Sequence, residues 1–369
     1  MRFADPGPTF RSILEPLFGK ASQDCGHQEE GVRQTIGFNI LALLFWASGL
    51  FWTAGCGSTP PAATATDSET ASAPARAVAV ATSVAFTEGP TVDNDGNVYF
   101  TDTENSRILK LSPEGVRTIF REPSNRANGL ILDAEGRLLA CEGSDAQVNQ
   151  PRITRTDLAT GKIEVLADSF EGKRLNQPND VTYDGQGRIY FTDRPRATPD
   201  PDQTGVNAVY RIDPDASLHR ILTEPDIEKP NGIVISPDDK TLYLIEAHPD
   251  EGRARMIRAY DLQPDGSVAN MRVFHDFYPG RSGDGMTIDS QGNLYVAAGL
   301  HNLRGTSETL DTRCGVHVFS PDGQLKEFVP IPEDTVTNCA FGGPDWKTLY
   351  VTAGKTLFQI RFDIEGTRR

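Results

Sequence analysis

The sequence predicts an all-β fold, a six-bladed β-propeller, from three observations. A polar residue, in five copies beside Gly or Pro, occurs six times from Glu88 onward at separations of 40 to 54 residues. Behind each copy come an apolar run, a turn and a second apolar run, which is the pattern of a β-hairpin. A four-stranded blade needs about 40 to 50 residues, which matches this period. The six motifs are Glu88-Gly89-Pro90, Asn128-Gly129, Pro178-Asn179-Asp180, Pro230-Asn231-Gly232, Gly283-Asp284-Gly285 and Thr337-Asn338-Cys339.

The turns inside these hairpins share a second motif. Four of the six turns read Asp-x-x-Gly. The other two read Ser236-Pro237-Asp238-Asp239 and Gly343-Pro344-Asp345. Such residues favour tight turns, because Asp bonds nearby backbone and Gly tolerates positive φ. The four regular turns are Asp93–Gly96, Asp133–Gly136, Asp184–Gly187 and Asp289–Gly292.

A closed ring needs the two ends of the propeller to meet. We predict that residues 78–82 form an outer strand that pairs with residues 357–360 and hides the sheet edges. The propeller is therefore expected to span residues 78–369.

The N-terminal 77 residues read as an export segment and a linker. Residues 36–52 carry no charge, and about 17 apolar residues suit the core of an export signal better than a membrane span. Ala54-Gly55-Cys56 resembles a bacterial lipoprotein site, with lipid on Cys56; a plain signal peptide or a retained anchor is the alternative. Residues 1–31 carry no export pattern and are expected to lie outside the native product. Residues 57–77 form a low-complexity, disordered tether. These features predict an exported protein, periplasmic or membrane-tethered through Cys56.

The composition and net charge limit the classes of molecule that the protein is expected to bind. The chain of 369 residues is 38% apolar and has a net charge of −15, which argues against nucleic acid and anionic lipid surfaces. Membrane contact is expected only through an N-terminal lipid or anchor. Cys141, Cys314 and Cys339 have no metal-ligand spacing and are expected to be buried as small hydrophobes, with one disulfide as the alternative.

The six recurring polar residues should converge on the propeller axis, since each precedes an innermost strand. The alternative for any one copy is a plain turn. Glu88 and Asp284 beside several amides form a hard, oxygen-only donor set, which suits calcium above all, with manganese, magnesium or zinc as alternatives. Without a cation, the two carboxylates would repel each other in a narrow channel.

The chain also resembles a known family between about Phe86 and Phe362. The resemblance rests on Glu88-Gly89-Pro90, on residues 174–180, on Tyr190-Phe191-Thr192-Asp193, on Pro230-Asn231-Gly232 with Ser236-Pro237-Asp238, on Asp284-Gly285-Met286, and on residues 338–343 with 349–352. These motifs resemble the gluconolactonase, senescence marker protein (regucalcin) and luciferin-regenerating enzyme family. The resemblance implies a six-bladed propeller with one catalytic dication on Glu88, Asn179, Asn231 and Asp284, positions at which the diisopropyl fluorophosphatase propellers are also similar.

On this basis we expect a metal-dependent hydrolase of a lactone. The dication would polarise the carbonyl, Glu88 and Asp284 would act as catalytic carboxylates, and Asp284 would help to deprotonate water. Asn128, Asn176 and Gln177 are the expected substrate contacts, Gln177 standing where animal members of the family have Arg. His248 and His301 are candidate proton shuttles or plain loop residues. The alternatives are a phosphotriesterase-like hydrolase and a non-catalytic ligand-binding propeller.

Overall fold

The computed structural model describes residues 75–81, 84–143 and 149–368. The chain divides into two units, Met1–Glu69 and Thr70–Arg369. The predictions for the export segment, the linker up to residue 74 and lipid attachment at Cys56 lie outside the described residues and stay predictions. Within the described residues, no helix is long and apolar enough to cross a membrane.

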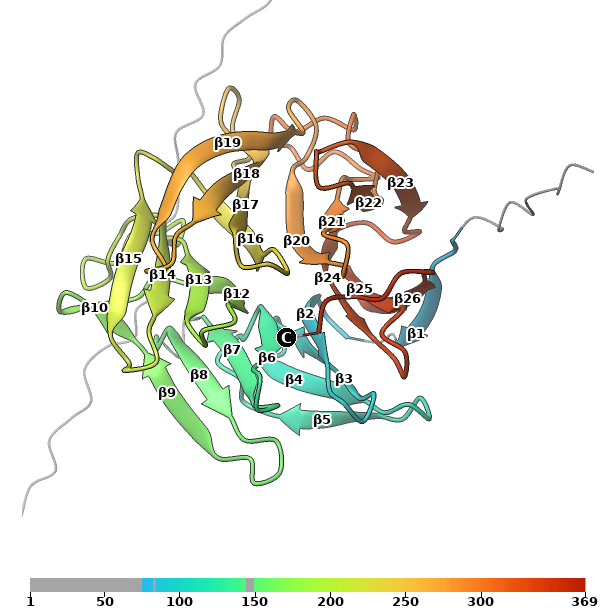
Figure 1. The fold of residues 1–369 in the computed structure, drawn as a ribbon, viewed down its shortest axis with the longest axis horizontal. Helices are drawn as coiled ribbons and strands as arrows, with labels where there is room; N and C mark the ends of the chain where they lie inside the picture. The colour runs from blue at the N-terminus through green and yellow to red at the C-terminus, as the bar shows by residue number, and fades with distance from the viewer. Residues whose placement is uncertain (1–74, 82–83, 144–148, 369) are drawn as a thin grey trace, which may run out of the picture. The chain divides into compact units, whose positions relative to one another are not determined.

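The second unit is a six-bladed β-propeller, as predicted, and its described residues contain no helix. Six four-stranded sheets lie around a common axis (Figure 1). The first three sheets are β2 (Thr87–Val92), β3 (Val98–Asp102), β4 (Arg107–Leu111) and β5 (Arg117–Arg121); β6 (Leu130–Leu132), β7 (Leu138–Glu142), β8 (Arg152–Thr156) and β9 (Ile163–Ala167); and β12 (Pro178–Tyr183), β13 (Ile189–Asp193), β14 (Ala208–Ile212) and β15 (Leu218–Thr223).

The remaining sheets continue the same order around the ring. They are β16 (Pro230–Ile235), β17 (Thr241–Ala247), β18 (Arg255–Leu262) and β19 (Val268–Asp276); β20 (Gly283–Ile288), β21 (Leu294–Ala298), β22 (Gly315–Phe319) and β23 (Leu325–Pro330); and β24 (Val336–Gly342), β25 (Thr348–Ala353), β26 (Thr356–Arg361) and β1 (Val78–Ala81). A short hairpin, β10 (Ser169–Phe170) with β11 (Lys173–Arg174), precedes the third sheet.

The predicted ring closure is confirmed. Strand β1 pairs antiparallel with β26, with Val78 opposite Gln359 and Ala79 opposite Phe358. The first described strand therefore completes the last sheet, and the free edge of β26 is covered.

The predicted turns contain a residue with positive φ, as their sequence motif requires. In the regular turns Gly96, Gly136, Gly187 and Gly292 have positive φ, between 74° and 83°. In the two irregular turns a non-glycine residue takes this conformation, Asp239 at φ 56° and Trp346 at φ 57°. The Asp of three turns also accepts a hydrogen bond from a Tyr hydroxyl six residues later, for example Tyr190 to Asp184 at 3.0 Å.

The first strand of each sheet lies nearest the axis. Strands β2, β12, β16, β20 and β24 each contact the first strand of a neighbouring sheet. They pack so closely that a Cβ on Gly232 would meet the Asp284 carbonyl oxygen at 2.6 Å, and a Cβ on Gly285 would meet the Asn338 side chain. Only glycine fits there, which explains why Gly follows the polar residue in these motifs.

Apolar residues of adjacent sheets fill the space between the blades. One cluster joins the fifth and sixth sheets through Tyr295, Val316, Phe341 and Phe358. Cys141, Cys314 and Cys339 are buried free thiols, as expected, and the described residues contain no disulfide.

Candidate active site

Four buried carboxylates hold the loops that lead into the first strands. They are the last residues of β3, β7 and β13 and the penultimate residue of β17: Asp102, Glu142, Asp193 and Glu246. Asp102 accepts the Ala85 and Phe86 N–H groups, and Glu246 accepts the Glu228 and Lys229 N–H groups. Asn125 and Asn176 donate to the other two. We call these four residues the loop clamps, because each fixes the chain two to three residues before an axis residue.

The axis residues Glu88, Asn179, Asn231 and Asp284 begin the first strands of four sheets and are 4 to 8% exposed. We call them the axis set. Asn231 Nδ2 donates to Asp284 Oδ1 at 2.7 Å, which joins the fourth and fifth sheets directly. Asp284 Oδ2 accepts from Arg281 at 2.5 Å. Arg281 is itself buried and also donates to the Val336 carbonyl, so this ion pair is fixed from three sides.

Glu88 has a very different environment. Burial raises its pKa well above the usual range, and repulsion from Asp284 and from Asp180 raises it further. Arg194 and the Gly89 N–H act in the opposite direction with smaller effect. No cation of a described residue lies within ion-pair distance of this carboxylate. Within the part of the chain that the structure describes, Glu88 is therefore a buried acid without an ion-pair partner.

A dication fits this set of donors. Both Glu88 and Asp284 are hard oxygen donors, and each Asn can add an amide oxygen. Among the described residues, the Asn179 amide has no hydrogen-bond partner, and Asn231 uses only its Nδ2. The described residues contain no cluster of three or more His, Cys, Asp or Glu that could hold a metal. The candidate set thus depends on two carboxylates and two amides.

A polar cavity of about 240 Å³ opens beside Glu88 and Asn179. Asn128 and Gln177 line it, as expected for substrate contacts, together with Arg126 and Arg194. Asn176 does not: it is fully buried, with Nδ2 donating to Asp193 and Val206 and Oδ1 accepting from Gly205. The burial of Asn176 does not support a substrate contact. This residue is instead the partner of the loop clamp Asp193.

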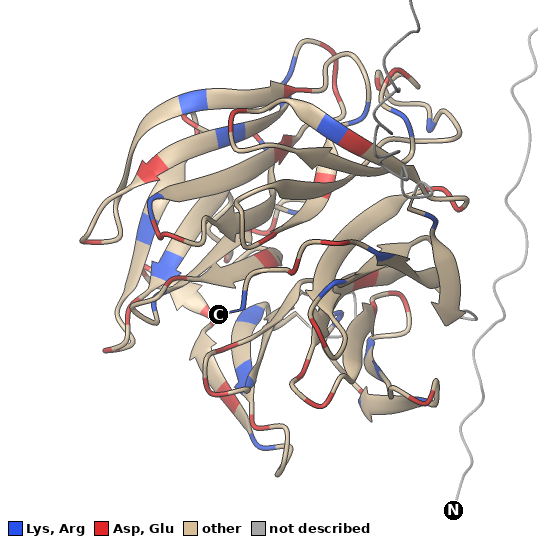
Figure 2. Cartoon of the chain, turned by 45° about the vertical axis from the view of Figure 1, so that its right-hand side comes forward, with Lys and Arg blue, Asp and Glu red and all other residues tan. Residues whose placement is uncertain are grey.

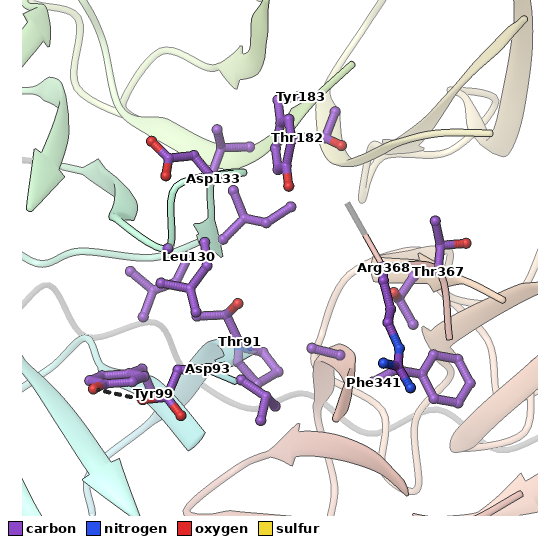
Figure 3. Close-up of a pocket in the computed structure, with 18 of the residues that line it drawn as sticks. Thr91, Asp93, Tyr99, Leu130, Asp133, Thr182, Tyr183, Phe341, Thr367 and Arg368 are labelled. Carbon is purple, nitrogen blue, oxygen red and sulfur yellow. Dashed lines mark hydrogen bonds between the residues drawn. The ribbon is translucent and has the colours of Figure 1, made fainter. Parts of the chain in front are cut away.

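A larger cavity of about 510 Å³ lies further along the same first strands, beyond the axis residues with which they begin (Figure 3). Thr91, Thr182, Phe341, Thr367 and Arg368 line it, and none of the axis set does. We assign the chemistry to the smaller cavity, because Glu88 and Asn179 of the axis set line it and no residue of the axis set lines the larger one.

The two histidines occupy ordinary loop environments. The His301 ring bonds the Ile331 carbonyl at 2.8 Å, and His301 is exposed. His248 is half-buried, and burial together with Arg253 lowers its pKa. Neither ring lies in the lining of the 240 Å³ cavity.

Three residues near the axis were not singled out from the sequence. Arg281 stands three positions before Asp284, and Lys229 two positions before Asn231. Asp180 directly follows Asn179; burial raises its pKa to about 7, despite hydrogen bonds from Ile233, Val181 and Asn338. Lys229 lies directly before β16, outside the strand whose alternation could have been read from the sequence. No pattern signalled Arg281.

Comparison with known proteins identifies the family. The model of the SMP-30/Gluconolactonase/LRE-like region matches residues 86–355, most of the chain. The chain belongs to this family. The matched region spans the axis set and all four loop clamps, so the geometry above is that of a family member's propeller.

Named relatives agree. A gluconolactonase from Zymomonas mobilis subsp. mobilis is 28% identical over 308 residues, covering 76% of this chain and 79% of that protein. Pentonolactonase XacC of Haloferax volcanii is 29% identical over 277 residues, covering 73% of this chain and 82% of that protein. The solved structure of a gluconolactonase from Xanthomonas campestris has a TM-score of 0.65 and 30% identity, covering 78% of this chain and 89% of that one.

Proposed function

We propose that this chain is a hydrolase of a lactone that uses one divalent cation, calcium foremost, with manganese, magnesium or zinc as alternatives. Its relatives carry the names of lactonases, which supports the reaction. The observation that carries the metal is Glu88, a buried carboxylate that faces Asp284 without a cation of its own.

The axis set would hold the ion. Glu88 and Asp284 would supply the negative charge, and the amide oxygens of Asn179 and Asn231 would complete the protein ligands. When bound, the dication supplies polarisation of the lactone carbonyl. Arg281 donates to Oδ2 of Asp284 and Asn231 donates to Oδ1, so the orientation of this carboxylate does not depend on the ion.

The reaction itself needs one water and one proton transfer. The water oxygen bonds to the carbonyl carbon, the ring C–O bond breaks, and the ring oxygen takes a proton to give the hydroxy acid. Asp284 is the proposed acceptor of the proton from the attacking water; its Oδ2 accepts from Arg281 and its Oδ1 from Asn231, so Oδ1 would take the proton in place of the neutral Asn231 donor. Asn128 and Gln177, in the cavity wall beside Glu88, would bind substrate hydroxyls.

The experiment measures metal binding and turnover together. Calorimetry measures calcium binding, and a pH-stat measures hydrolysis of D-glucono-1,5-lactone. Both are applied to the wild type, Glu88→Gln and Asp284→Asn. Asp322→Asn, at an exposed position, is the control. A chelator should abolish wild-type turnover, and calcium should restore it. Both axis variants should lose calcium affinity and at least about 100-fold in turnover, while the control keeps both. Wild-type turnover by chelated Asp284→Asn would refute the mechanism, and calcium binding without hydrolysis of any lactone would favour a binding propeller.

A further inference from the structure

Two arginines line the 240 Å³ cavity beside Glu88 and Asn179, and their surroundings differ. Arg126 pairs at 2.9 Å with Glu104, which also lines the cavity. No carboxylate of a described residue lies within ion-pair distance of Arg194. Figure 2 shows acidic and basic residues interspersed over the sheets, so the two arginines are not part of one large basic face. In a chain of net charge −15, an arginine without an ion-pair partner at a cavity calls for a local explanation.

The backbone of Arg194 is fixed beside the axis by the third sheet. In the pairing of β12 with β13, Pro178 lies opposite Asp193, the residue directly before Arg194. The Arg194 N–H then lies 3.5 Å from the Gln177 carbonyl oxygen, measured from the nitrogen. Gln177, Pro178 and Asn179 all line the cavity, so Arg194 faces three lining residues across the start of this strand pair.

The Arg194 side chain is half-buried and forms part of the cavity wall together with Glu88. Its positive charge opposes the rise in the pKa of Glu88, which agrees with a position on the same side of the cavity. The two groups do not form an ion pair, so the guanidinium donors stay available to a molecule that enters the cavity.

Hydrolysis of a lactone creates negative charge on the substrate itself. When water adds to the carbonyl carbon, the charge develops on the carbonyl oxygen. After the ring C–O bond breaks, the charge remains in the carboxylate of the product. Hydrogen-bond donors that are already in place where charge develops lower the barrier of such a reaction. A guanidinium suits this role, because it is planar, has five N–H donors and keeps its proton throughout.

We infer that Arg194 is a catalytic residue, which donates hydrogen bonds to the lactone carbonyl oxygen as that oxygen becomes negative and to the product carboxylate after the ring opens. This inference rests on the proposed lactonase function. Arg194 transfers no proton, so Asp284 keeps its proposed role as the base. Arg126 differs, because Glu104 already balances its charge.

The test follows hydrolysis of D-glucono-1,5-lactone by the calcium-loaded full chain in a pH-stat. Arg194→Ala should lower kcat about 100- to 1,000-fold and change KM less than about threefold, because the lost hydrogen bonds form mainly in the transition state. Arg194→Lys keeps the charge without the planar fork and should lose about tenfold less than Arg194→Ala.

Two further measurements detect the guanidinium itself. Guanidinium chloride, well below the concentration that unfolds the protein, should raise kcat of Arg194→Ala about tenfold, whereas equal sodium chloride should not. Inhibition by the product D-gluconate should weaken at least about tenfold in Arg194→Ala, because a charge-assisted hydrogen bond to its carboxylate is lost. A residue that only supports the fold would show neither effect.

Arg126→Ala is the matched variant from the same cavity, and guanidinium should not raise its kcat. Lys240→Ala removes an exposed cation that pairs with Asp238 and should keep wild-type kinetics. Calcium affinity should be unchanged or higher in Arg194→Ala, since a positive charge near Glu88 is removed.

The outcomes separate this inference from the function on which it rests. If Arg194→Ala keeps kcat within about threefold of the wild type, or if guanidinium raises kcat equally in Arg126→Ala, the inference is wrong and the lactonase function stands. A fall in calcium affinity in Arg194→Ala would make Arg194 a support of the axis set and would also overturn the inference. A wild type that binds calcium but hydrolyses no lactone would overturn both.

Discussion

Glu142 of the loop clamps and Glu88 of the axis set are both buried carboxylates, yet their surroundings are opposite. Glu142 accepts from Arg121, Arg152, Thr154 and Asn125, so its charge and lone pairs are satisfied within the protein. Glu88, equally removed from solvent, has no ion-pair partner among the described residues, and its pKa rises accordingly. A buried carboxylate with partners serves the structure, and one without them requires a ligand.

The difference extends to the amides. Asn176, in a clamp, uses Nδ2 and Oδ1 for three protein partners, whereas the Asn179 amide has none among the described residues. Asn176 lies two residues before β12, and Asn179 is the second residue of that strand. Residue type alone therefore does not separate structural from functional Asn; the position of the side chain relative to the axis does.

Breaking a clamp should have the largest effect on stability. Glu142→Gln leaves Arg121 and Arg152 without a counter-charge, so we expect a loss of about 3 to 5 kcal/mol in the free energy of unfolding. Urea unfolding followed by fluorescence measures it. Glu135→Gln, whose carboxylate is exposed and pairs with Arg137, is the control and should stay within about 0.5 kcal/mol. A small loss in Glu142→Gln would mean that the clamps contribute little to the fold.

Acid should destabilise the protein through His317, a buried imidazole that belongs neither to the loop clamps nor to the axis set. Burial lowers the pKa of His317 to about 4, from 6.5. The unfolded chain then binds a proton between pH 6.5 and 4 that the folded chain does not, so stability falls as the pH falls through this window, by up to about 3 kcal/mol.

Urea unfolding at pH 7.0 and 4.5 measures this loss. His317→Phe should flatten the decline, whereas replacement of exposed His219 by Gln should leave it unchanged. Clamp and axis variants are best compared above about pH 7.5, where the histidine of the unfolded chain is also mostly neutral. If the free energy of unfolding falls equally in His317→Phe, another group causes the loss of stability at acid pH.

The two amides near β12 and β6 should respond in opposite ways. Asn176→Ala leaves the Gly205 N–H and the Val206 carbonyl without their partner, at a cost of about 1 to 3 kcal/mol in stability. Asn128→Ala removes a cavity-lining amide and should cost less than about 0.5 kcal/mol while raising KM for the lactone. Thermal unfolding and steady-state kinetics on both variants measure this. A KM effect in Asn176→Ala at unchanged stability would contradict the assignment.

The smallest effect on stability is expected at Glu88. Replacing it by Gln removes an uncompensated charge, so the Tm of the calcium-free protein should stay the same or rise, and the rise on adding calcium should disappear. Asp284→Asn should instead lower the calcium-free Tm, because Arg281 loses its partner. Differential scanning calorimetry with and without calcium compares the two. A calcium-free Tm that drops in Glu88→Gln would show that this carboxylate already has a partner.

The sequence predicted the parts of the fold that repeat. The blade period, the Asp-x-x-Gly turns and the pairing of β1 with β26 are local or periodic signals, and the structure confirms them. The positions of the axis residues also follow, since each begins a first strand. The hairpin β10–β11 has no counterpart in other sheets and was not predicted.

The environment of each site residue could not be predicted. Whether Asn176 faces the cavity or Asp193 depends on the loop between β11 and β12, and the Arg281–Asp284 pair depends on how the fifth and sixth sheets approach. These are contacts between segments that no periodicity relates. Metal binding stays a proposal for the same reason, because it depends on distances across the axis.

The pairing of β1 with β26 has a consequence for biogenesis. Strand β1 leaves the ribosome before the rest of the propeller, and it finds its partner only when β26 has been synthesised. Until then the sixth sheet lacks its outer strand, and the ring stays open. Closure therefore reports that the chain has been synthesised through β26, and a product interrupted before Thr356 would expose an unpaired β1 to proteases and chaperones.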